Sequence, residues 1–123
     1  MIDQVKTSGS GCVATYVGLI RDNSHGKKVE SVEYEDMNGK AEAVLNKIAD
    51  DVKKLWPIED IGIVHRIGKL KVGDVNFLVA IAAAHRGEGF EACRFVVDSF
   101  KQQLPTKKTE TYADGTTLVG GKD

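Results

Sequence analysis

One nearly uninterrupted apolar run, at residues 75–84, constrains the fold of this chain more than any other stretch. The run is too short to cross a membrane, so it predicts a central strand that is covered on both faces. A segment of mixed polarity, residues 85–108, follows it directly. We therefore expect the strand to deliver His85 and Arg86 to its carboxyl end, where a helix then begins.

That helix is predicted from an apolar stripe with steps of three and four residues. The stripe consists of Phe90, Cys93, Val97, Phe100 and Leu104. Pro105 is expected to end the helix before an extended exit. The opposite face is then available for chemistry, and the whole segment gathers five basic side chains: His85, Arg86, Arg94, Lys101 and Lys108.

The remaining elements follow from local patterns along the chain. Strands are expected over residues 11–20 and 29–36, from Ile61 to a stop at Gly68, over 69–74 as a short strand or loop, over 107–113, and over 116–119 after an Asp114–Gly115 turn. Residues 21–28 form a polar loop, and a first helix runs from an N-cap at Asn38 to Leu55. The order predicts an α+β domain with two helices on a mainly antiparallel sheet. The 123 residues indicate a single domain, 1–123.

Charge and cysteine content exclude several classes of protein. Seventeen basic and eighteen acidic residues nearly cancel, so neither nucleic acid nor an anionic membrane is an expected partner. No stretch has the character of a signal peptide or a membrane span, which predicts a cytoplasmic protein. Cys12 and Cys93 lie in apolar patterns without ligand spacing, so we interpret both as small buried hydrophobic residues rather than a metal site or a disulfide.

The basic residues themselves suggest local anion chemistry. Two lysines at short range disfavour each other's protonation, and a neutral amine is a nucleophile or a base. On charge alone, however, a solvated basic face is the favoured interpretation. His85 is equally consistent with a general acid or base and with a structural role. His65 is interpreted as a packed core residue, and Arg21 stands at a strand end, where scaffolds present functional groups.

Several motifs, in this order and spacing, resemble one family, the large catalytic subunit of molybdopterin synthase. The matching pieces are Gly-Cys-Val-Ala-Thr-Tyr-Val-Gly-Leu-Ile-Arg at 11–21, Leu-Trp-Pro at 55–57, Ile-Val-His-Arg-Ile-Gly-Lys-Leu-Lys-Val-Gly-Asp at 63–74, Ala-His-Arg at 84–86, Phe-Glu-Ala at 90–92, and Lys101 with Pro105 and Lys108. The resemblance covers about residues 9–119. It implies an α/β-hammerhead fold, which agrees with the predicted order of elements.

The resemblance also implies a reaction and partners. Members of this family convert cyclic pyranopterin monophosphate (precursor Z) to molybdopterin by inserting two dithiolene sulfurs. A ubiquitin-like sulfur-carrier small subunit delivers the sulfur as a thiocarboxylate on its C-terminal Gly-Gly. Two catalytic subunits form a homodimer within a heterotetramer, and no metal or organic cofactor is expected at the site.

Site residues are carried over by the same resemblance. Lys101 and Lys108 are the expected catalytic residues, with the roles of nucleophile, base and oxyanion partner left open between them. Arg21, His85 and Arg86 are expected to line the same pocket and bind substrate, because guanidinium groups suit phosphate and carboxylate oxygens.

Three departures from the family pattern stand out. The segment before the first strand is short. Thr106 and Lys107 replace residues that are aromatic in many relatives, so a less apolar pocket wall is expected. Relatives also extend further at the carboxyl end and lend a basic side chain to the neighbouring subunit's pocket, a role for which Lys122 is the candidate here.

Two other functions compete with the synthase. The first is a non-catalytic dimeric module that binds a small anion or a partner's tail. The second is an acylphosphatase-like hydrolase, which leaves the paired lysines without a use. The enzyme requires Arg21, Arg86, Lys101 and Lys108 to converge on one concave pocket, whereas separate solvent faces favour the module.

Overall fold

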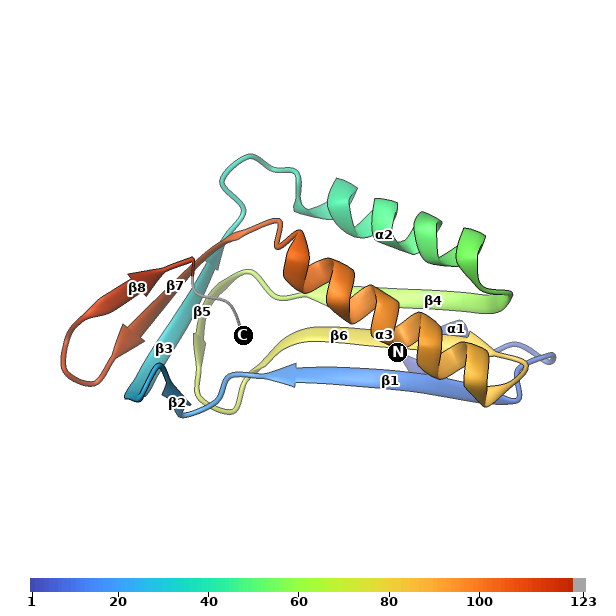
Figure 1. Cartoon of the computed structure of the whole chain (residues 1–123), viewed down its shortest axis with the longest axis horizontal. Helices are drawn as coiled ribbons and strands as arrows, with labels where there is room; N and C mark the ends of the chain where they lie inside the picture. The colour runs from blue at the N-terminus through green and yellow to red at the C-terminus, as the bar shows by residue number, and fades with distance from the viewer. Residues whose placement is uncertain (121–123) are drawn as a thin grey trace.

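The computed structural model describes residues 1–120, and its central element is the strand β6 (Val75–Ala83). This strand lies between β1 (Cys12–Leu19) and β4 (Ile58–His65) in a three-stranded antiparallel sheet (Figure 1). Residues 79–83 are fully buried. The apolar run therefore forms the predicted central strand, and it ends two residues before His85.

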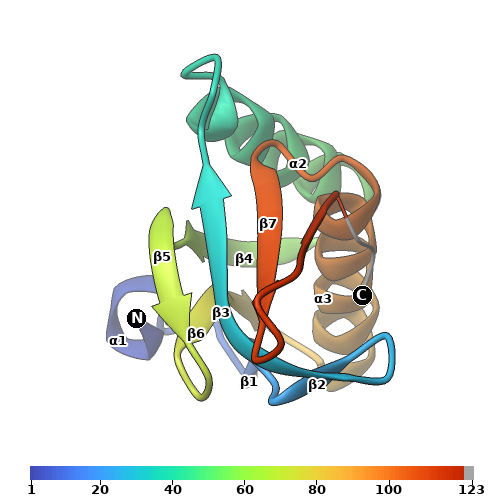
Figure 2. The same cartoon turned by 90° about the vertical axis from the view of Figure 1, so that its left-hand side faces the viewer.

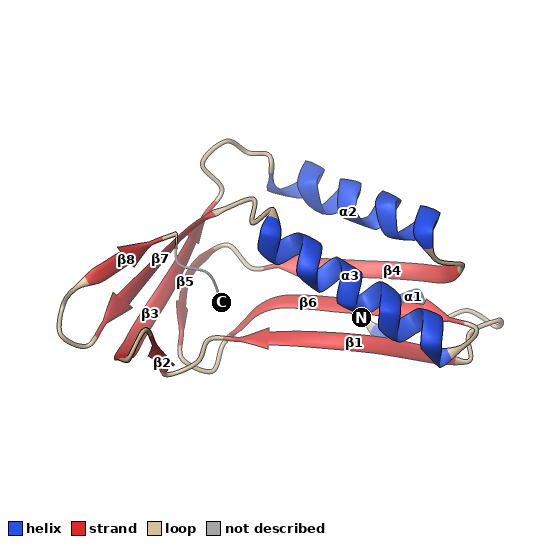
Figure 3. Cartoon of the chain, viewed as in Figure 1, coloured by secondary structure: helices blue, strands red, loops and turns tan. Residues whose placement is uncertain are grey.

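Two helices cover one face of this sheet, as Figure 3 shows: α2 (Ala41–Leu55) and α3 (Arg86–Gln102). Their buried side chains meet those of β6 in the main core, which includes Ile48, Val52, Phe77, Val79, Ile81, Val96 and Phe100. The rings of Phe77 and Phe100 stack with their centroids 3.8 Å apart. The carboxyl end of α3 is thereby fixed on the sheet.

The start of α2 differs from the prediction that Asn38 caps it. The carboxylate of Asp36 accepts the backbone N–H groups of Lys40 at 3.1 Å and Ala41 at 3.3 Å, while Asn38 is exposed. Gly39, with a φ of 64°, turns the chain between them. Asp36 therefore accepts the first free N–H groups of the helix from four and five residues upstream.

The buried face of α3 is also rotated from the predicted stripe. Phe90 is 65% exposed, whereas Ala92 and Val96 are fully buried. Small residues cause the rotation, because a side chain at Gly89 would come within 3.3 Å of the Cys12 sulfur. The helix thus approaches β1 closely on a face of small residues. The predicted stripe was based mainly on large apolar residues and did not include this face.

A second sheet crosses the end of the first, as Figure 2 shows from that side. It contains β2 (Asn23–Ser24), β3 (Lys27–Glu35), β5 (Gly68–Lys71), β7 (Lys107–Tyr112) and β8 (Thr117–Val119). The α+β class with mainly antiparallel strands is confirmed, but the strands form two sheets rather than one. The Asp114–Gly115 turn joins β7 to β8 as predicted, and the polar segment 21–28 includes a hairpin around His25 and Gly26, both with positive φ.

The helix α1 (Ile2–Val5) was not predicted, since four residues are too few to show a period. Its Val5 is 3% exposed and packs with Ala80 and Ala82 on the face of β6 away from α3. Within residues 1–120, no helix is long and apolar enough to cross a membrane.

Candidate functional site

A pocket of about 200 Å³ lies where the two sheets meet. The residues that follow β1, the strands β3 and β7, and the last turn of α3 all contribute to its walls. The polar side chains in the lining include Arg21, Ser24, Tyr34, Asn76, Lys101, Lys108 and Glu110. The pocket is therefore built from segments far apart in the sequence.

The break at Pro105 brings Lys101 and Lys108 to this pocket. Lys101 is in the last turn of α3 and is partly buried, and Lys108 is the second residue of β7 and 4% exposed. The chain turns between them, so that β7 pairs with β3 and Lys108 lies opposite Tyr34. A second pocket, of about 470 Å³, is also lined by Tyr34, Lys101 and Lys108. These three residues stand between the two pockets.

Arg21 joins the two lysines from a third element. It follows the end of β1 and is exposed at the pocket rim. Three of the five predicted site residues, Arg21, Lys101 and Lys108, thus line one concave site. A guanidinium and two lysines around one cavity favour an anionic ligand.

The other two predicted site residues, His85 and Arg86, are not in this pocket. They lie at the first turn of α3, and Figure 1 shows that this end points away from the second sheet. Arg86 and Lys101 are about 22 Å apart along the helix axis at 1.5 Å per residue. Arg94, halfway along, forms an exposed ion pair with Asp98 at 3.7 Å. Within one chain, the predicted basic cluster is therefore split between the two ends of α3.

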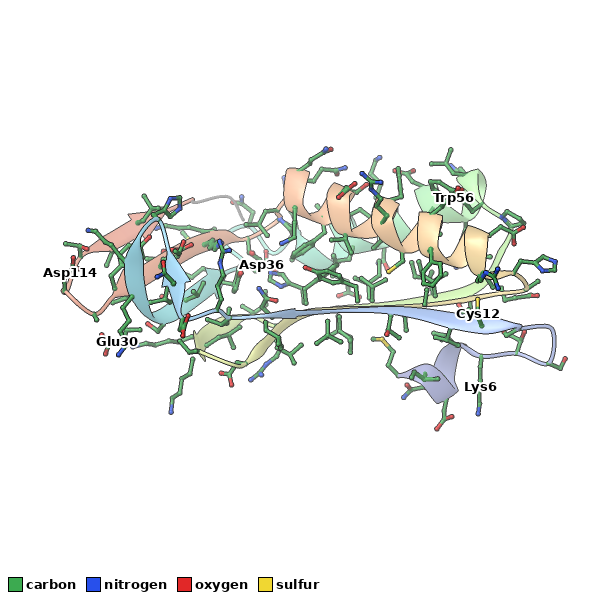
Figure 4. All side chains as sticks on the ribbon, turned by 60° about the horizontal axis from the view of Figure 1, so that its bottom comes forward. Lys6, Cys12, Glu30, Asp36, Trp56 and Asp114 are labelled. Atoms are coloured by element: carbon green, nitrogen blue, oxygen red, sulfur yellow. The ribbon has the colours of Figure 1, made fainter. Side chains whose placement is uncertain are left out.

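Among the described residues, neither cysteine lines either pocket. Figure 4 shows Cys12 at the end of the long sheet where Trp56 lies, far from Asp36 at the junction. Cys93 is buried in the core, and burial raises the pKa of its thiol, which disfavours the reactive thiolate. Within the described chain, no three His, Cys, Asp or Glu residues gather to hold a metal ion.

The acidic member of the site, Glu110, was not predicted from the sequence. Its side chain is 3% exposed, lines the pocket and lies 3.4 Å from the Lys108 ammonium nitrogen. The Tyr112 hydroxyl donates a hydrogen bond of 2.7 Å to the same carboxylate. A signal was present, because Lys108, Glu110 and Tyr112 alternate along the predicted strand and must share one face.

The surroundings of Glu110 keep it ionised. Burial alone would raise the pKa of its carboxyl group, but hydrogen bonds from Tyr112 and Ser24 and the charge of Lys108 outweigh burial and hold the pKa below its ordinary value. The site therefore contains one buried anion beside a buried lysine. The roles that the predictions give to Lys122 fall outside the described residues.

Known proteins resemble this chain in sequence over most of its length. A sequence model described as MoaE protein matches residues 1–103. The molybdopterin synthase catalytic subunit of Homo sapiens is 35% identical over 113 residues, which cover 92% of this chain and 60% of the human protein. The chain thus spans about three fifths of that relative's length.

Solved structures share the fold. The crystal structure of molybdopterin synthase from Staphylococcus aureus matches with a TM-score of 0.89 at 30% identity and covers 98% of this chain and 87% of its own. A chain from a protein–protein complex of subunit 1 and 2 of molybdopterin-converting factor from Helicobacter pylori 26695 matches with a TM-score of 0.72 over 91% and 73% of the two chains. At 16% identity, the latter shows the fold alone. The chain belongs to the MoaE protein family, that of the molybdopterin synthase catalytic subunits.

Proposed function

We propose that this chain is the catalytic subunit of a molybdopterin synthase, which converts precursor Z to molybdopterin with sulfur from a thiocarboxylated ubiquitin-like small subunit. The observation that carries the proposal is the convergence of Arg21, Lys101 and Lys108 on one pocket in a chain of this family. Both reactants are anions, a cyclic phosphate and a thiocarboxylate. A generic solvated basic face would not leave one of its lysines only 4% exposed.

The two pockets suggest separate binding sites for the substrate and for the carrier tail. Arg21 lines only the smaller one, where its guanidinium suits the substrate phosphate. We assign the larger one to the extended Gly-Gly tail of the carrier. Lys101 and Lys108 line both, so an amine there can act as nucleophile, base or oxyanion partner where the tail and the pterin meet.

Reconstituted conversion tests this function. Purified chain, thiocarboxylated carrier and precursor Z are mixed, and the dithiolene product is followed. Product formation supports the synthase. A folded chain that binds the carrier without forming product would instead be the non-catalytic binding module. Absence of carrier binding would contradict both the synthase and the binding module. The cytoplasmic location and the single-domain organisation stay predictions.

Substitution of Arg21 should weaken substrate binding. We expect Arg21→Ala to raise the KM for precursor Z by about 10- to 100-fold, because a charge-assisted hydrogen bond contributes roughly 1.5–3 kcal/mol. Arg21→Lys keeps the charge but loses the bidentate geometry, so its KM should lie between those of the wild type and Arg21→Ala. Steady-state kinetics measures this, with carrier affinity as the control. An unchanged KM for precursor Z in Arg21→Ala would place the phosphate elsewhere.

The remote His85–Arg86 pair fits the proposal through the predicted homodimer. A pair that is about 22 Å from Lys101 on its own helix can act in the pocket only if a second copy supplies it. The Helicobacter pylori match, a chain of a two-subunit complex, is consistent at the level of the fold with a further carrier subunit. Two copies of this chain, each with one carrier subunit, would make the predicted heterotetramer.

Mixed dimers test this arrangement. We expect Lys101→Ala and Arg86→Ala to be inactive alone, yet to regain about a quarter of the wild-type rate after random exchange of equal amounts, since about half of the dimers are then mixed. Sharing between copies would rebuild one complete site per mixed dimer, because that site takes Lys101 and Arg86 from different chains. If each site used its own Arg86, mixing would restore nothing. Mass spectrometry of differently tagged copies verifies that exchange has occurred.

A further inference from the structure

We propose that His65 is a positioning residue that fixes Lys101 and Lys108 relative to each other. The inference rests on the proposed function, since it concerns the lysines of that site. His65 is the last residue of β4 and lines neither pocket among the described residues. It therefore acts through its neighbours rather than on a reactant.

On one side, His65 contacts the support of Lys101. Its ring meets the ring of Phe100 edge to face, with centroids 4.9 Å apart and planes at 72°. Phe100 directly precedes Lys101 and is 4% exposed, held by its stacking on Phe77. A shift of the imidazole would therefore move the last turn of α3.

On the other side, His65 contacts both supports of Lys108. Its Nε2 lies 2.9 Å from the hydroxyl of Thr106, two residues before Lys108. Its ring also meets that of Tyr34 at 4.8 Å and 82°, and Tyr34 is opposite Lys108 in the β3–β7 register. One side chain thus touches the neighbours of both lysines, which come from different elements.

The hydrogen bonds define the state of the imidazole. Its Nδ1 lies 3.0 Å from the backbone carbonyl of Asn76, which can only accept, so Nδ1 carries the hydrogen. The neutral Nε2 then accepts from Thr106. Burial lowers the pKa of His65, only partly offset by the Asn76 hydrogen bond and the charge of Asp36, which favours this neutral form.

Asn76 closes the network. Its side-chain amide donates to the Tyr34 hydroxyl at 2.9 Å, while its carbonyl holds His65. Rings locked by directional bonds on two sides have little freedom to rotate. Displacement of a reacting group by about 1 Å can cost on the order of 10²-fold in rate, so this rigidity has a use at a site with two cooperating amines.

Three substitutions separate positioning from general stability. His65→Phe keeps a ring and removes both hydrogen bonds. Thr106→Val keeps the shape and removes only the Nε2 bond. His65→Gln retains one donor and one acceptor and serves as the conservative rescue. Val52→Ala, a core truncation on α2 away from the lysines, is the control for lost stability.

The first readout needs neither substrate nor carrier. In ¹³C-lysine-labelled protein, the ε-methylene NMR signals of Lys101 and Lys108 should shift in His65→Phe and Thr106→Val. They should stay near wild type in Val52→Ala and largely return in His65→Gln. The second readout is conversion of precursor Z. We expect kcat to fall by about 10²-fold in His65→Phe and by less in Thr106→Val, with KM within about twofold.

The outcomes are distinguishable from failure of the proposed function. If wild type forms no product, the synthase proposal fails, and the lysine signals still decide on positioning. Lysine signals that are unchanged in Thr106→Val and in whichever His65 variants fold would overturn the inference. A loss of kcat no larger than that of a Val52→Ala control with equal stability would also overturn it.

Discussion

Lys101→Ala should abolish dithiolene formation, with a loss of about 10³-fold or more in single-turnover rate. Lys101 lines both pockets, so its amine is within reach of reactants that enter from either side. The substitution removes a partly buried side chain at the end of α3 and leaves the core contacts of Phe100 in place. Dimerisation and carrier binding should therefore survive, and each is measured in the same preparation.

Lys101→Arg distinguishes the positive charge of Lys101 from the reactivity of its neutral amine. Arginine keeps a positive charge but stays protonated in proteins, so it cannot act as a nucleophile or a base. We expect it to be as inactive as the alanine variant if Lys101 reacts through its neutral amine. Substantial activity in Lys101→Arg would instead assign Lys101 to charge stabilisation. Full activity in Lys101→Ala would remove Lys101 from the chemistry.

The parts of the fold that local patterns predicted are those with an uninterrupted or periodic apolar signal. The strand at 75–84 is apolar on both faces, which is why its central place in the sheet could be inferred. The division into two sheets could not, because alternation within β3 or β7 says that one face is buried but not which strand lies beside it. Four residues in α1 carry no period at all.

The site was predictable in part for a similar reason. Arg21, Lys101 and Lys108 were found because family motifs mark them, and the structure brings them together. Glu110 was missed because an acidic residue in a weakly alternating segment is usually solvated, and only tertiary packing buries it. The distance of Arg86 from Lys101, by contrast, follows from the length of the predicted helix alone.

Glu110→Ala should be the most destabilising change at the site, with a loss of about 3–5 kcal/mol in the free energy of unfolding. The carboxylate balances the charge of the buried Lys108 and accepts the Tyr112 hydroxyl, so its removal disturbs several buried groups at once. Chemical denaturation monitored by circular dichroism measures the loss. A loss within about 0.5 kcal/mol, as for an ordinary surface substitution, would show that the site is well hydrated.

The pH dependence gives a second check. The pKa of Glu110 is lower in the folded chain than its unfolded value of about 4.3. Its ionisation therefore stabilises the folded state above that unfolded value, and this contribution disappears as the pH falls through the folded pKa. The stability difference between wild type and Glu110→Gln should accordingly be largest near neutrality and shrink in acid. A difference independent of pH would mean that the carboxylate charge contributes nothing.

A paired replacement separates the stability of this site from its function. Lys108→Met combined with Glu110→Leu removes both charges and fills the same space, and apolar replacement of a buried ion pair is often neutral or stabilising by about 1–4 kcal/mol. We expect the double variant to be far more stable than Glu110→Ala, yet to be inactive, because it lacks the Lys108 amine. If the double variant kept its activity, Lys108 would be a structural residue and the catalytic amine would be Lys101 alone. If it were as unstable as Glu110→Ala, the hydrogen bonds of Tyr112 and Ser24, rather than the charge pair, would hold this end of β7 in place.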